Sequence, residues 1–197
     1  MTIIGITGTL GAGKGTIVNY LESKGFGHYS SRKFIVAEIE RRGMPVNRDS
    51  MTVVANDLRT THSPSYIAEQ LYKEASFANT KAIIESIRAE GEVMALRKMG
   101  DFYLLSIDAD PKTRYERIIA RANETDRISF EKFMADEARE MTSTDPTKQN
   151  LSRCIELADF RLLNNGTIEG LRHDIDRILE EIRLKQAEKT LTHSTNG

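Results

Sequence analysis

Residues 2–16 read T-I-I-G-I-T-G-T-L-G-A-G-K-G-T, and this stretch decides the class of fold. An apolar run, Thr2–Thr7, precedes a glycine-rich loop, and an amphipathic segment begins at about Gly15. This order predicts a strand, a tight loop and a helix. Phosphate oxygens need converging backbone N–H groups, which a glycine loop at a helix N-terminus supplies, and Lys14 adds a mobile positive charge. The stretch predicts a phosphate-binding loop; the other interpretation is an ordinary glycine-rich turn with a surface lysine.

The residue after the lysine departs from the usual pattern of such loops. A Ser or Thr directly after the lysine usually contacts magnesium, whereas here Gly15 intervenes and the hydroxyl belongs to Thr16. Thr16 is the candidate metal contact, and direct ligation by it stays open. The candidate phosphate contacts of the loop are Gly8, Gly11, Ala12, Gly13, Lys14, Gly15 and Thr16.

The rest of the chain alternates strand-like and helical patterns. Apolar runs predict strands at Thr2–Thr7, Phe26–Tyr29, Ala82–Ser86, Phe102–Asp108 and Phe160–Leu163. Helical spacing predicts helices from about Gly15, over Arg32–Arg42, Ser50–Thr61, Pro64–Phe77 and Ala89–Met99, after an Asp110 cap, and over residues 168–182. Alternating strands and helices favour an α/β fold with three layers, in which helices cover both faces of a five-stranded parallel sheet. Ligands of such folds bind beyond the carboxyl ends of the strands.

Length and charge indicate one globular domain without a polyanionic partner. The 197 residues are 39% hydrophobic, and 28 Lys and Arg balance 29 Asp and Glu. A net charge of −1 does not steer a protein to nucleic acid or to an anionic membrane. The lone Cys154 and the absence of a basic leader fit a cytoplasmic protein. We expect one domain over residues 1–186 and a frayed polar tail over residues 187–197.

Two stretches resemble known kinases. The pattern G-x-x-G-x-G-K-G-T at Gly8–Thr16 resembles the loop of adenylate kinases and related nucleoside monophosphate kinases. The stretch Q-N-L-S-R-C-I-E-L-A-D-F-R-L-L-N-N-G-T at 149–167 is similar to dephospho-CoA kinases, which carry a comparable A-D-strand-N-x-G ending. The resemblance covers about residues 2–185. It implies a three-layer P-loop NTPase fold with a short lid, ATP as phosphate donor and Mg²⁺ as cofactor.

The segment after the second strand separates the two kinase families. Dephospho-CoA kinases usually carry an acidic signature there, whereas this chain reads H-Y-S-S-R-K-F at 28–34. The segment resembles the acceptor-binding region of monophosphate kinases, in which a Ser/Thr pair precedes an arginine. This resemblance implies an acceptor-binding insertion at about residues 30–78, with Ser30, Ser31 and Arg32 as acceptor contacts. The monophosphate kinases carry their arginine a few residues later, so Arg32 as an exposed helix residue is the other interpretation.

Three further charged residues are candidates for the acceptor side. Related small kinases have an acid and an arginine at the end of the third strand, where this chain has Glu85 and Arg88. The other interpretation of this pair is an ion pair between the two side chains. Arg59 follows Leu58 in a predicted helix and is either an acceptor contact or an ordinary helix residue.

A polar stretch between two helices, A-N-E-T-D-R-I-S-F at 122–130, resembles a short lid over about residues 121–139. Closure of a lid carries guanidinium groups onto phosphates and expels water. The resemblance implies that Arg121 and Arg127 contact ATP phosphates and that Arg139 contacts the acceptor.

Arg114, Arg117 and Arg121 recur at helical spacing, either as phosphate contacts or as a solvated helix face. Arg117 and Arg121 are the candidate ATP contacts among them. The resemblance implies that Asn164, Asn165 and Gly166 pass beside adenine, with Asn165 and Gly166 as the candidate ATP contacts, although turn chemistry alone also selects Asn-Gly.

The residues support three hypotheses. The first is transfer of the γ-phosphate of ATP to a nucleoside monophosphate or a similar small phosphorylated acceptor. The second is a dephospho-CoA kinase, and the third is a nucleotide-dependent switch that hydrolyses ATP and acts through a partner protein. The candidate catalytic residues are Lys14, Arg88, Arg121 and Arg127.

Overall fold

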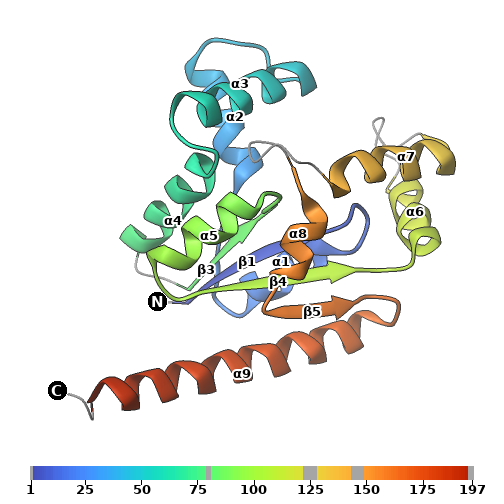
Figure 1. Cartoon of the computed structure of the whole chain (residues 1–197). Coiled ribbons are helices and arrows are strands. Elements are labelled where there is room, and N and C mark those ends of the chain that lie inside the picture. Colours follow the sequence, from blue (N-terminus) through green and yellow to red (C-terminus); the bar gives the residue numbers. More distant parts are fainter. Residues whose placement is uncertain (1, 79–80, 122–127, 143–148, 195–197) are drawn as a thin grey trace.

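The computed structural model describes residues 2–78, 81–121, 128–142 and 149–194. Its centre is one five-stranded sheet in the order β2-β3-β1-β4-β5, in which all neighbouring strands are parallel (Figure 1). The strands are β1 (Ile3–Gly8), β2 (Gly27–Ser30), β3 (Ala82–Glu85), β4 (Phe102–Asp108) and β5 (Phe160–Leu163). The predicted fold class is confirmed.

Helices connect the strands and cover the sheet. They are α1 (Lys14–Ser23), α2 (Ser31–Arg41), α3 (Arg48–Thr61), α4 (Tyr66–Ala78), α5 (Glu90–Met99), α6 (Pro111–Ala120), α7 (Phe130–Met141), α8 (Leu151–Glu156) and α9 (Ile168–Ser194). The α7 helix overlaps the stretch that resembles a lid, and the α8 helix lies in the stretch that resembles dephospho-CoA kinases. In Figure 1, α2 and α3 stand on one side of the sheet's carboxyl edge and α6 and α7 on the other.

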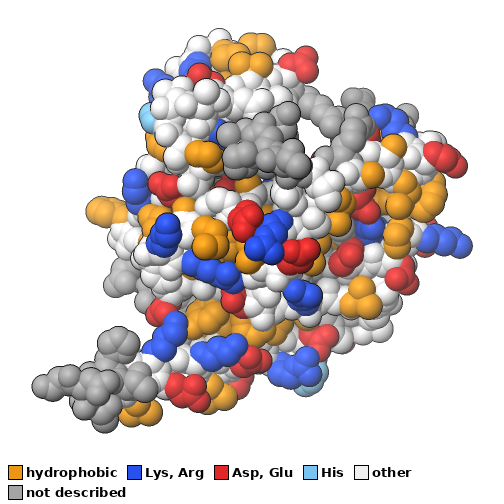
Figure 2. All heavy atoms as spheres, viewed as in Figure 1, with side chains coloured by type: hydrophobic (Ala, Val, Ile, Leu, Met, Phe, Trp, Pro, Cys, Tyr) orange, Lys and Arg blue, Asp and Glu red, His pale blue; other side chains and the backbone are white. Residues whose placement is uncertain are grey.

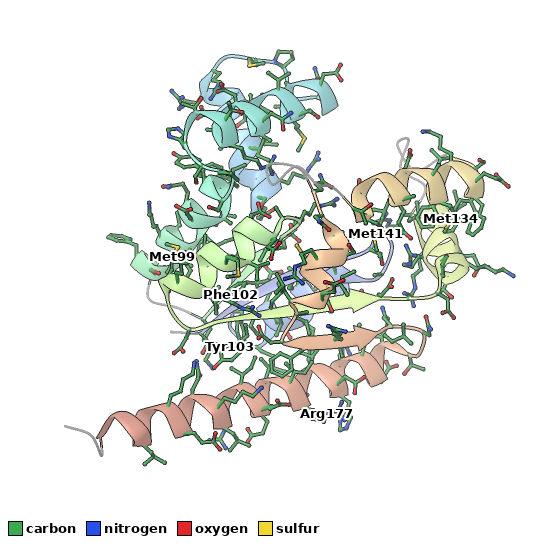
Figure 3. The ribbon with its side chains drawn as sticks, in the orientation of Figure 1. Met99, Phe102, Tyr103, Met134, Met141 and Arg177 are labelled. Carbon is green, nitrogen blue, oxygen red and sulfur yellow. The ribbon has the colours of Figure 1, made fainter. Side chains whose placement is uncertain are left out.

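Two hydrophobic cores lie on the two faces of the sheet. One joins the sheet to α2–α5 and α8, and the other joins it to α1 and α9. Successive strand residues point to opposite faces, so the neighbours Phe102 and Tyr103 on β4 belong to different cores. Figure 3 shows Phe102 on the α5 side and Tyr103 on the α9 side. Because both of these neighbours are large aromatic residues, each face of the sheet presents apolar side chains that helices bury.

All five strands end at the same edge of the sheet. The paired positions Gly8 with Ile107, Ile6 with Glu85, and Ser30 with Glu85 put the ends of β1, β2, β3 and β4 side by side. The loop, the start of α2 and the start of α6 therefore leave the sheet at one edge. This is the edge at which parallel sheets bind ligands.

Helix α9 ends later than predicted, because it continues to Ser194 whereas a frayed tail was expected from residue 187. Its C-terminal half packs beside the sheet through side-chain contacts that polarity alone does not predict. Gln186 is hydrogen-bonded to Thr2, and Lys189 pairs with Asp101 at 3.2 Å and lies over the ring of Tyr103. These contacts stabilise a helix end that carries few apolar residues.

A second expectation was also wrong in detail. Asp110 precedes α6 at the capping position, but its side chain makes no capping hydrogen bond. Its backbone N–H instead donates to the side chain of Asn165 at 2.8 Å. Pro111 occupies the first turn of α6, where a missing N–H costs nothing.

The surface carries mixed charges. Figure 2 shows Lys and Arg side chains interspersed with Asp and Glu on the face that it presents, in keeping with the near-zero net charge. Within the described ranges, no helix combines the length and the apolar character needed to cross a membrane.

Candidate functional site

The loop between β1 and α1 needs glycine at three positions, and at Gly11, which has φ +79°, a Cβ would collide with the backbone oxygen of Arg114. Gly8 has φ +140°, and a Cβ there would collide with the backbone oxygen of Ile107 in β4. Gly13 has φ +107°, and a Cβ there would collide with the side-chain amide of Asn164. Gly15, in contrast, has nothing within 4 Å of an added Cβ. The backbone thus turns tightly between β1 and α1, and the space beside Gly15 in the first turn of α1 is open.

Lys14 folds back over this loop. Its Nζ donates to the carbonyl oxygens of Gly8 and Thr9, both at 2.8 Å. Burial first, and then the positive charge of Arg88, lowers the pKa of Lys14 to about 8, while Glu140 and Glu85 act in the opposite direction. A loop held around an ammonium group in this way is arranged to receive an anion.

Asn164 fastens the loop to the end of β5. Its side-chain amide donates to the carbonyl of Ala12 at 2.8 Å, and its backbone N–H donates to the carbonyl of Asp108 at 2.7 Å. Its own carbonyl accepts from Nη2 of Arg117 at 2.9 Å. The resemblance to known kinases predicts adenine contacts at Asn164 and at the next two residues, Asn165 and Gly166. The contact of Asn164 with the loop was not predicted, because Ala12 and Asn164 lie 152 residues apart in the sequence.

Arg117 is one of the three arginines at helical spacing, and its guanidinium contacts the Asn164 carbonyl. Its Nη1 is buried and has no hydrogen-bond partner among the described residues. A buried guanidinium N–H without a partner is unusual and costly. Arg117 therefore has a donor available for a ligand, whereas Arg121 is exposed at the end of α6.

Arg114 supports the loop from below instead of lying on a solvated face. It is 2% exposed, and its Nε donates to the carbonyl of Ala109 at 2.8 Å. One Nη donates to the carbonyl of Leu10 at 3.3 Å, and both Nη atoms contact the carboxylate of Glu137 in α7. Its Nε also lies 3.3 Å from the carboxylate of Asp108. For Arg114 the solvated-face interpretation was wrong.

Glu85 is the centre of a polar cluster at the ends of β2 and β3. Its carboxylate accepts a hydrogen bond from Ser30 at 2.8 Å, and Nε2 of His28 lies 3.3 Å from it. The hydroxyl of Ser31 donates to the Glu85 carbonyl at 3.2 Å. Two of the predicted acceptor residues thus hold a third in place. Arg32 points elsewhere, because it is exposed and its guanidinium contacts the sulfur of Met51 in α3 at 3.3 Å.

Arg88 pairs with Glu140 of α7 at 2.6 Å and with the side chain of Gln149 at 3.1 Å, so the alternative of an ion pair with Glu85 was wrong. Its backbone is fixed at both ends, because its N–H donates to the carboxylate of Glu92 and its carbonyl accepts from Asn150. This fixed backbone holds Arg88 at the carboxyl edge of the sheet.

The backbone is strained just before Arg88. Ser86 adopts φ +67°, which non-glycine residues rarely adopt. Such strain concentrates where a site positions its groups.

Arg59 lies in the last turn of α3. Burial raises the pKa of Glu92, and the positive charge of Arg59 acts against that rise. The charges of Arg59 and Arg88 thus both act on the pKa of the buried Glu92 carboxyl. Thr16 lies half-buried in the first turn of α1. Arg127 and the side chain of Arg139 lie outside the described residues.

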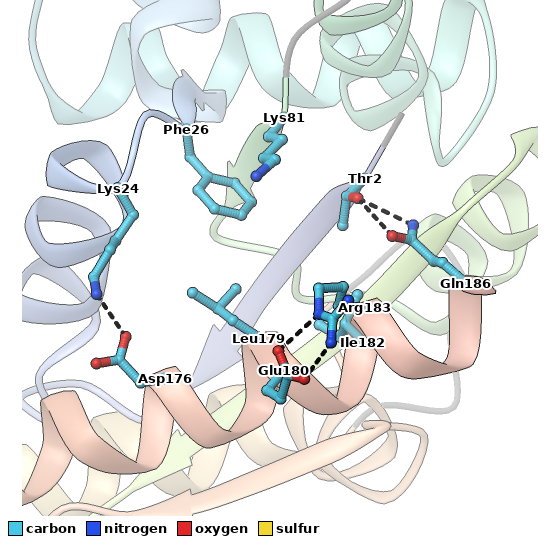
Figure 4. A pocket seen from close by; sticks show the side chains of 10 residues that line it. All are labelled: Thr2, Lys24, Phe26, Lys81, Asp176, Leu179, Glu180, Ile182, Arg183 and Gln186. Atoms are coloured by element: carbon cyan, nitrogen blue, oxygen red, sulfur yellow. Dashed lines mark hydrogen bonds and ion pairs between the residues drawn. The ribbon is translucent and has the colours of Figure 1, made fainter. Parts of the chain in front are cut away.

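A cavity at the opposite edge of the sheet contains none of these residues. It has a volume of about 350 Å³ and lies between α9 and the starts of β1, β2 and β3 (Figure 4). Its cations are largely neutralised: Lys24 pairs with Asp176, and Arg183 pairs with Glu180. The candidate site is therefore at the carboxyl edge, around Lys14.

Comparisons with known proteins agree with this fold. The family model of the AAA domain matches residues 4–144. The UPF0200 protein of Methanocaldococcus jannaschii is 30% identical over 185 residues, which cover 92% of this chain and 91% of that protein.

Solved kinases share the architecture at low identity. The dephospho-CoA kinase of Campylobacter jejuni superposes with a TM-score of 0.54 at 16% identity, covering 92% of this chain and 97% of its own. The shikimate kinase of Aquifex aeolicus gives a TM-score of 0.54 at 14% identity, covering 93% and 99%. The fold is thus that of P-loop kinases. The chain belongs to the UPF0200 protein family, and its residues 4–144 form an AAA domain.

Proposed function

We propose that this protein is an ATP-dependent phosphotransferase that moves the γ-phosphate of ATP onto a nucleoside monophosphate or a similar small phosphorylated acceptor. One observation carries the proposal: the ammonium of Lys14 lies in a glycine loop, 2.8 Å from the carbonyl oxygens of Gly8 and Thr9, and the charges of Arg88 and Glu85 at the neighbouring strand end act on its pKa. Phosphoryl transfer asks a protein mainly to align two ligands and to neutralise charge on the transferred group. A donor loop beside a strand-end acid and arginine meets that need.

On the donor side, the loop amides and Lys14 bind the β- and γ-phosphates. The buried and unpaired Nη1 of Arg117 offers a further donor beside Asn164, on the path that we assign to the adenosine portion of ATP. Asn165 and Gly166 line the same path by their position after β5. Arg121 and Arg127 complete the phosphate contacts when the lid region closes.

The residues present suit magnesium held mostly by the nucleotide. No three His, Cys, Asp or Glu side chains of the described part of the chain gather into a metal site. Mg²⁺ commonly keeps several waters and takes one or two protein oxygens together with substrate phosphates. Thr16 and Glu85 would supply such oxygens, and the ion would neutralise charge on the phosphates. Ser30 holds the Glu85 carboxylate in position for this role.

On the acceptor side, Arg59 and Arg88 provide positive charge for a phosphorylated ligand. Ser30 and Ser31 open α2 next to Glu85 and border the same space. Arg32 reaches the acceptor after it leaves the sulfur of Met51. Arg139 is the remaining acceptor contact in this proposal.

A second candidate within the same chemistry is a dephospho-CoA kinase. The fold similarity to the enzyme of Campylobacter jejuni and the Ala158-Asp159 to Asn165-Gly166 ending favour it. In this chain Asp159 has a structural role, because its carboxylate accepts from the backbone N–H of Leu104 at 2.7 Å. The resemblance of this ending to dephospho-CoA kinases therefore indicates a shared fold more than a shared acceptor.

A turnover panel tests the proposal. ADP release is measured with ATP and Mg²⁺ in the presence of each nucleoside monophosphate and of dephospho-CoA. We expect at least one monophosphate to raise ADP release well above the rate with water alone. Stimulation by dephospho-CoA only would favour the second candidate, and no stimulation by any acceptor would favour a switch ATPase.

A further inference from the structure

Two glutamates of α7 reach the cations around the loop from one side. Glu137 contacts Arg114, and Glu140, three residues later, contacts Arg88. Residues three apart lie on one face of a helix. In Figure 3, Met141 marks the end of α7 nearer the centre of the molecule and Met134 lies towards its outer end. The C-terminal end of α7 therefore faces the candidate site.

The Glu137 contact is an anchor. The side chains of Arg114 and Glu137 are 3% and 13% exposed, and both Nη atoms of Arg114 contact the carboxylate. The ring of Phe133 lies beneath the guanidinium, and Tyr115 of α6 packs against Phe130 and Phe133. Removing one partner of a buried pair is costly, so this half of α7 stays fixed to α6.

The Glu140 contact is of a different kind. The side chains of Arg88 and Glu140 are 31% and 44% exposed, and one guanidinium nitrogen makes the contact. Half-exposed ion pairs contribute little to stability. Glu140 also raises the pKa of Lys14, so its carboxylate lies in the field of both cations. A carboxylate that pairs with the strand-end Arg88, and whose charge also acts on the loop Lys14, competes for the positive charge that would neutralise a phosphoryl group.

We propose that Glu140 is an internal competitor for the phosphoryl group that binds at Arg88 and Lys14. The inference rests on the proposed function and names the specificity-determining contact of the same site. An incoming phosphoryl group repels the Glu140 carboxylate and takes over the guanidinium of Arg88. Because Glu137 keeps the preceding turn on Arg114, only the last turn of α7 is released. Ligands that bring no phosphoryl charge cannot displace Glu140, so the contact discriminates against them.

Affinity measurements on matched variants test this competition. Glu140→Gln removes the competing charge and keeps the shape, and we expect ATP with Mg²⁺ to bind roughly three- to tenfold more tightly than to the natural chain. Asp136→Asn is the matched control, since it removes a carboxylate from the same helix that pairs with Lys132. Its ATP affinity should stay within about twofold. Glu137→Gln should lower the melting temperature and should not tighten binding.

Amide hydrogen exchange supplies a readout independent of affinity. Adding ATP to the natural chain should accelerate exchange in the last turn of α7 and leave its first two turns unchanged. In Glu140→Gln the last turn should exchange faster without ATP. Unchanged or weaker ATP binding by a folded Glu140→Gln chain would overturn the competitor role and leave the proposed function standing. Failure of both chains to bind ATP would overturn the proposed function, and the competitor role with it.

Discussion

The carboxyl edge of the sheet has a donor half and an acceptor half that are built differently. In the donor half, buried side chains donate to main-chain carbonyls: Asn164 to Ala12, and Arg114 to Leu10 and Ala109. In the acceptor half, the half-exposed side chain of Arg88 contacts another half-exposed side chain, that of Glu140. Main-chain partners fix a geometry, whereas exposed side-chain pairs exchange partners at low cost. The donor half is therefore preformed and the acceptor half is adaptable.

The largest expected effect is in the donor half. Lys14→Ala should lower turnover by roughly two orders of magnitude or more, because the lysine neutralises charge that develops on the transferred group. Steady-state ADP release with saturating ATP measures it, and circular dichroism checks that the variant is folded. Turnover close to that of the natural chain would remove Lys14 from the chemistry.

The next effect compares two glycines of one loop. Gly13→Ala should weaken ATP binding by roughly tenfold to a hundredfold, since strain of about 1–3 kcal/mol at a left-handed position and the collision with Asn164 distort the loop. Gly15→Ala is the control, because it keeps the backbone N–H that would contact phosphate and its added Cβ meets no atom of the folded chain. Its ATP affinity should change by less than about twofold. An equal loss of ATP affinity in Gly13→Ala and Gly15→Ala would contradict a preformed loop, because the two positions would then tolerate a Cβ equally poorly.

The pH dependence follows from the pKa of Lys14, which burial lowers from 10.5 to about 8. Above pH 8 the free protein loses this charge, so ATP affinity should fall by roughly tenfold between pH 7 and pH 9. Binding at pH 9 should take up a proton, which calorimetry detects as a heat that varies with the buffer.

The same pKa difference fixes the sign of the effect on folding. Between pH 8 and 10.5 the unfolded chain binds more protons at Lys14 than the folded chain does. The contribution of this group to the free energy of unfolding therefore rises with pH in that window. Denaturant titrations of the natural chain and of Lys14→Ala measure it, and a contribution that falls with pH would contradict the assigned environment.

The smallest effect is at the opposite edge of the sheet. Lys24→Ala removes a cation that lines the cavity between α1 and α9 and pairs with Asp176 at 2.9 Å. Turnover and ATP affinity should stay within about twofold of the natural chain. A large loss of ATP affinity would show that phosphate binding depends on this edge as well.

The difference between the two halves also explains what the sequence could predict. Local patterns predicted the loop, the five strands and their parallel direction, because strand and helix periodicity and glycine spacing are properties of neighbouring residues. Contacts between distant residues carried no such pattern. The hydrogen bond from the Asn164 amide to Ala12 joins residues that lie 152 positions apart, and the pairing of Arg88 with Glu140 joins residues that lie 52 positions apart. The burial of Arg114 likewise depends on its tertiary neighbours.

The acceptor residues show the limit most clearly. Ser30, Ser31 and Glu85 were predicted as separate ligand contacts, yet both serine hydroxyls donate to Glu85, that of Ser30 to the carboxylate and that of Ser31 to the carbonyl. Arg32 was placed by its position after the serines, but in a helix the side-chain direction depends on tertiary neighbours such as Met51. The extension of α9 to Ser194 similarly depends on contacts with Thr2 and Asp101 at the start of β1 and before β4.

The central claim is that the loop around Lys14 binds a nucleoside triphosphate. Isothermal titration calorimetry of ATP with Mg²⁺ into the folded protein tests it most directly. We expect saturable binding of one ATP per chain, and much weaker binding to Lys14→Ala. Absence of binding for both ATP and GTP, with the protein folded and magnesium present, would contradict the account.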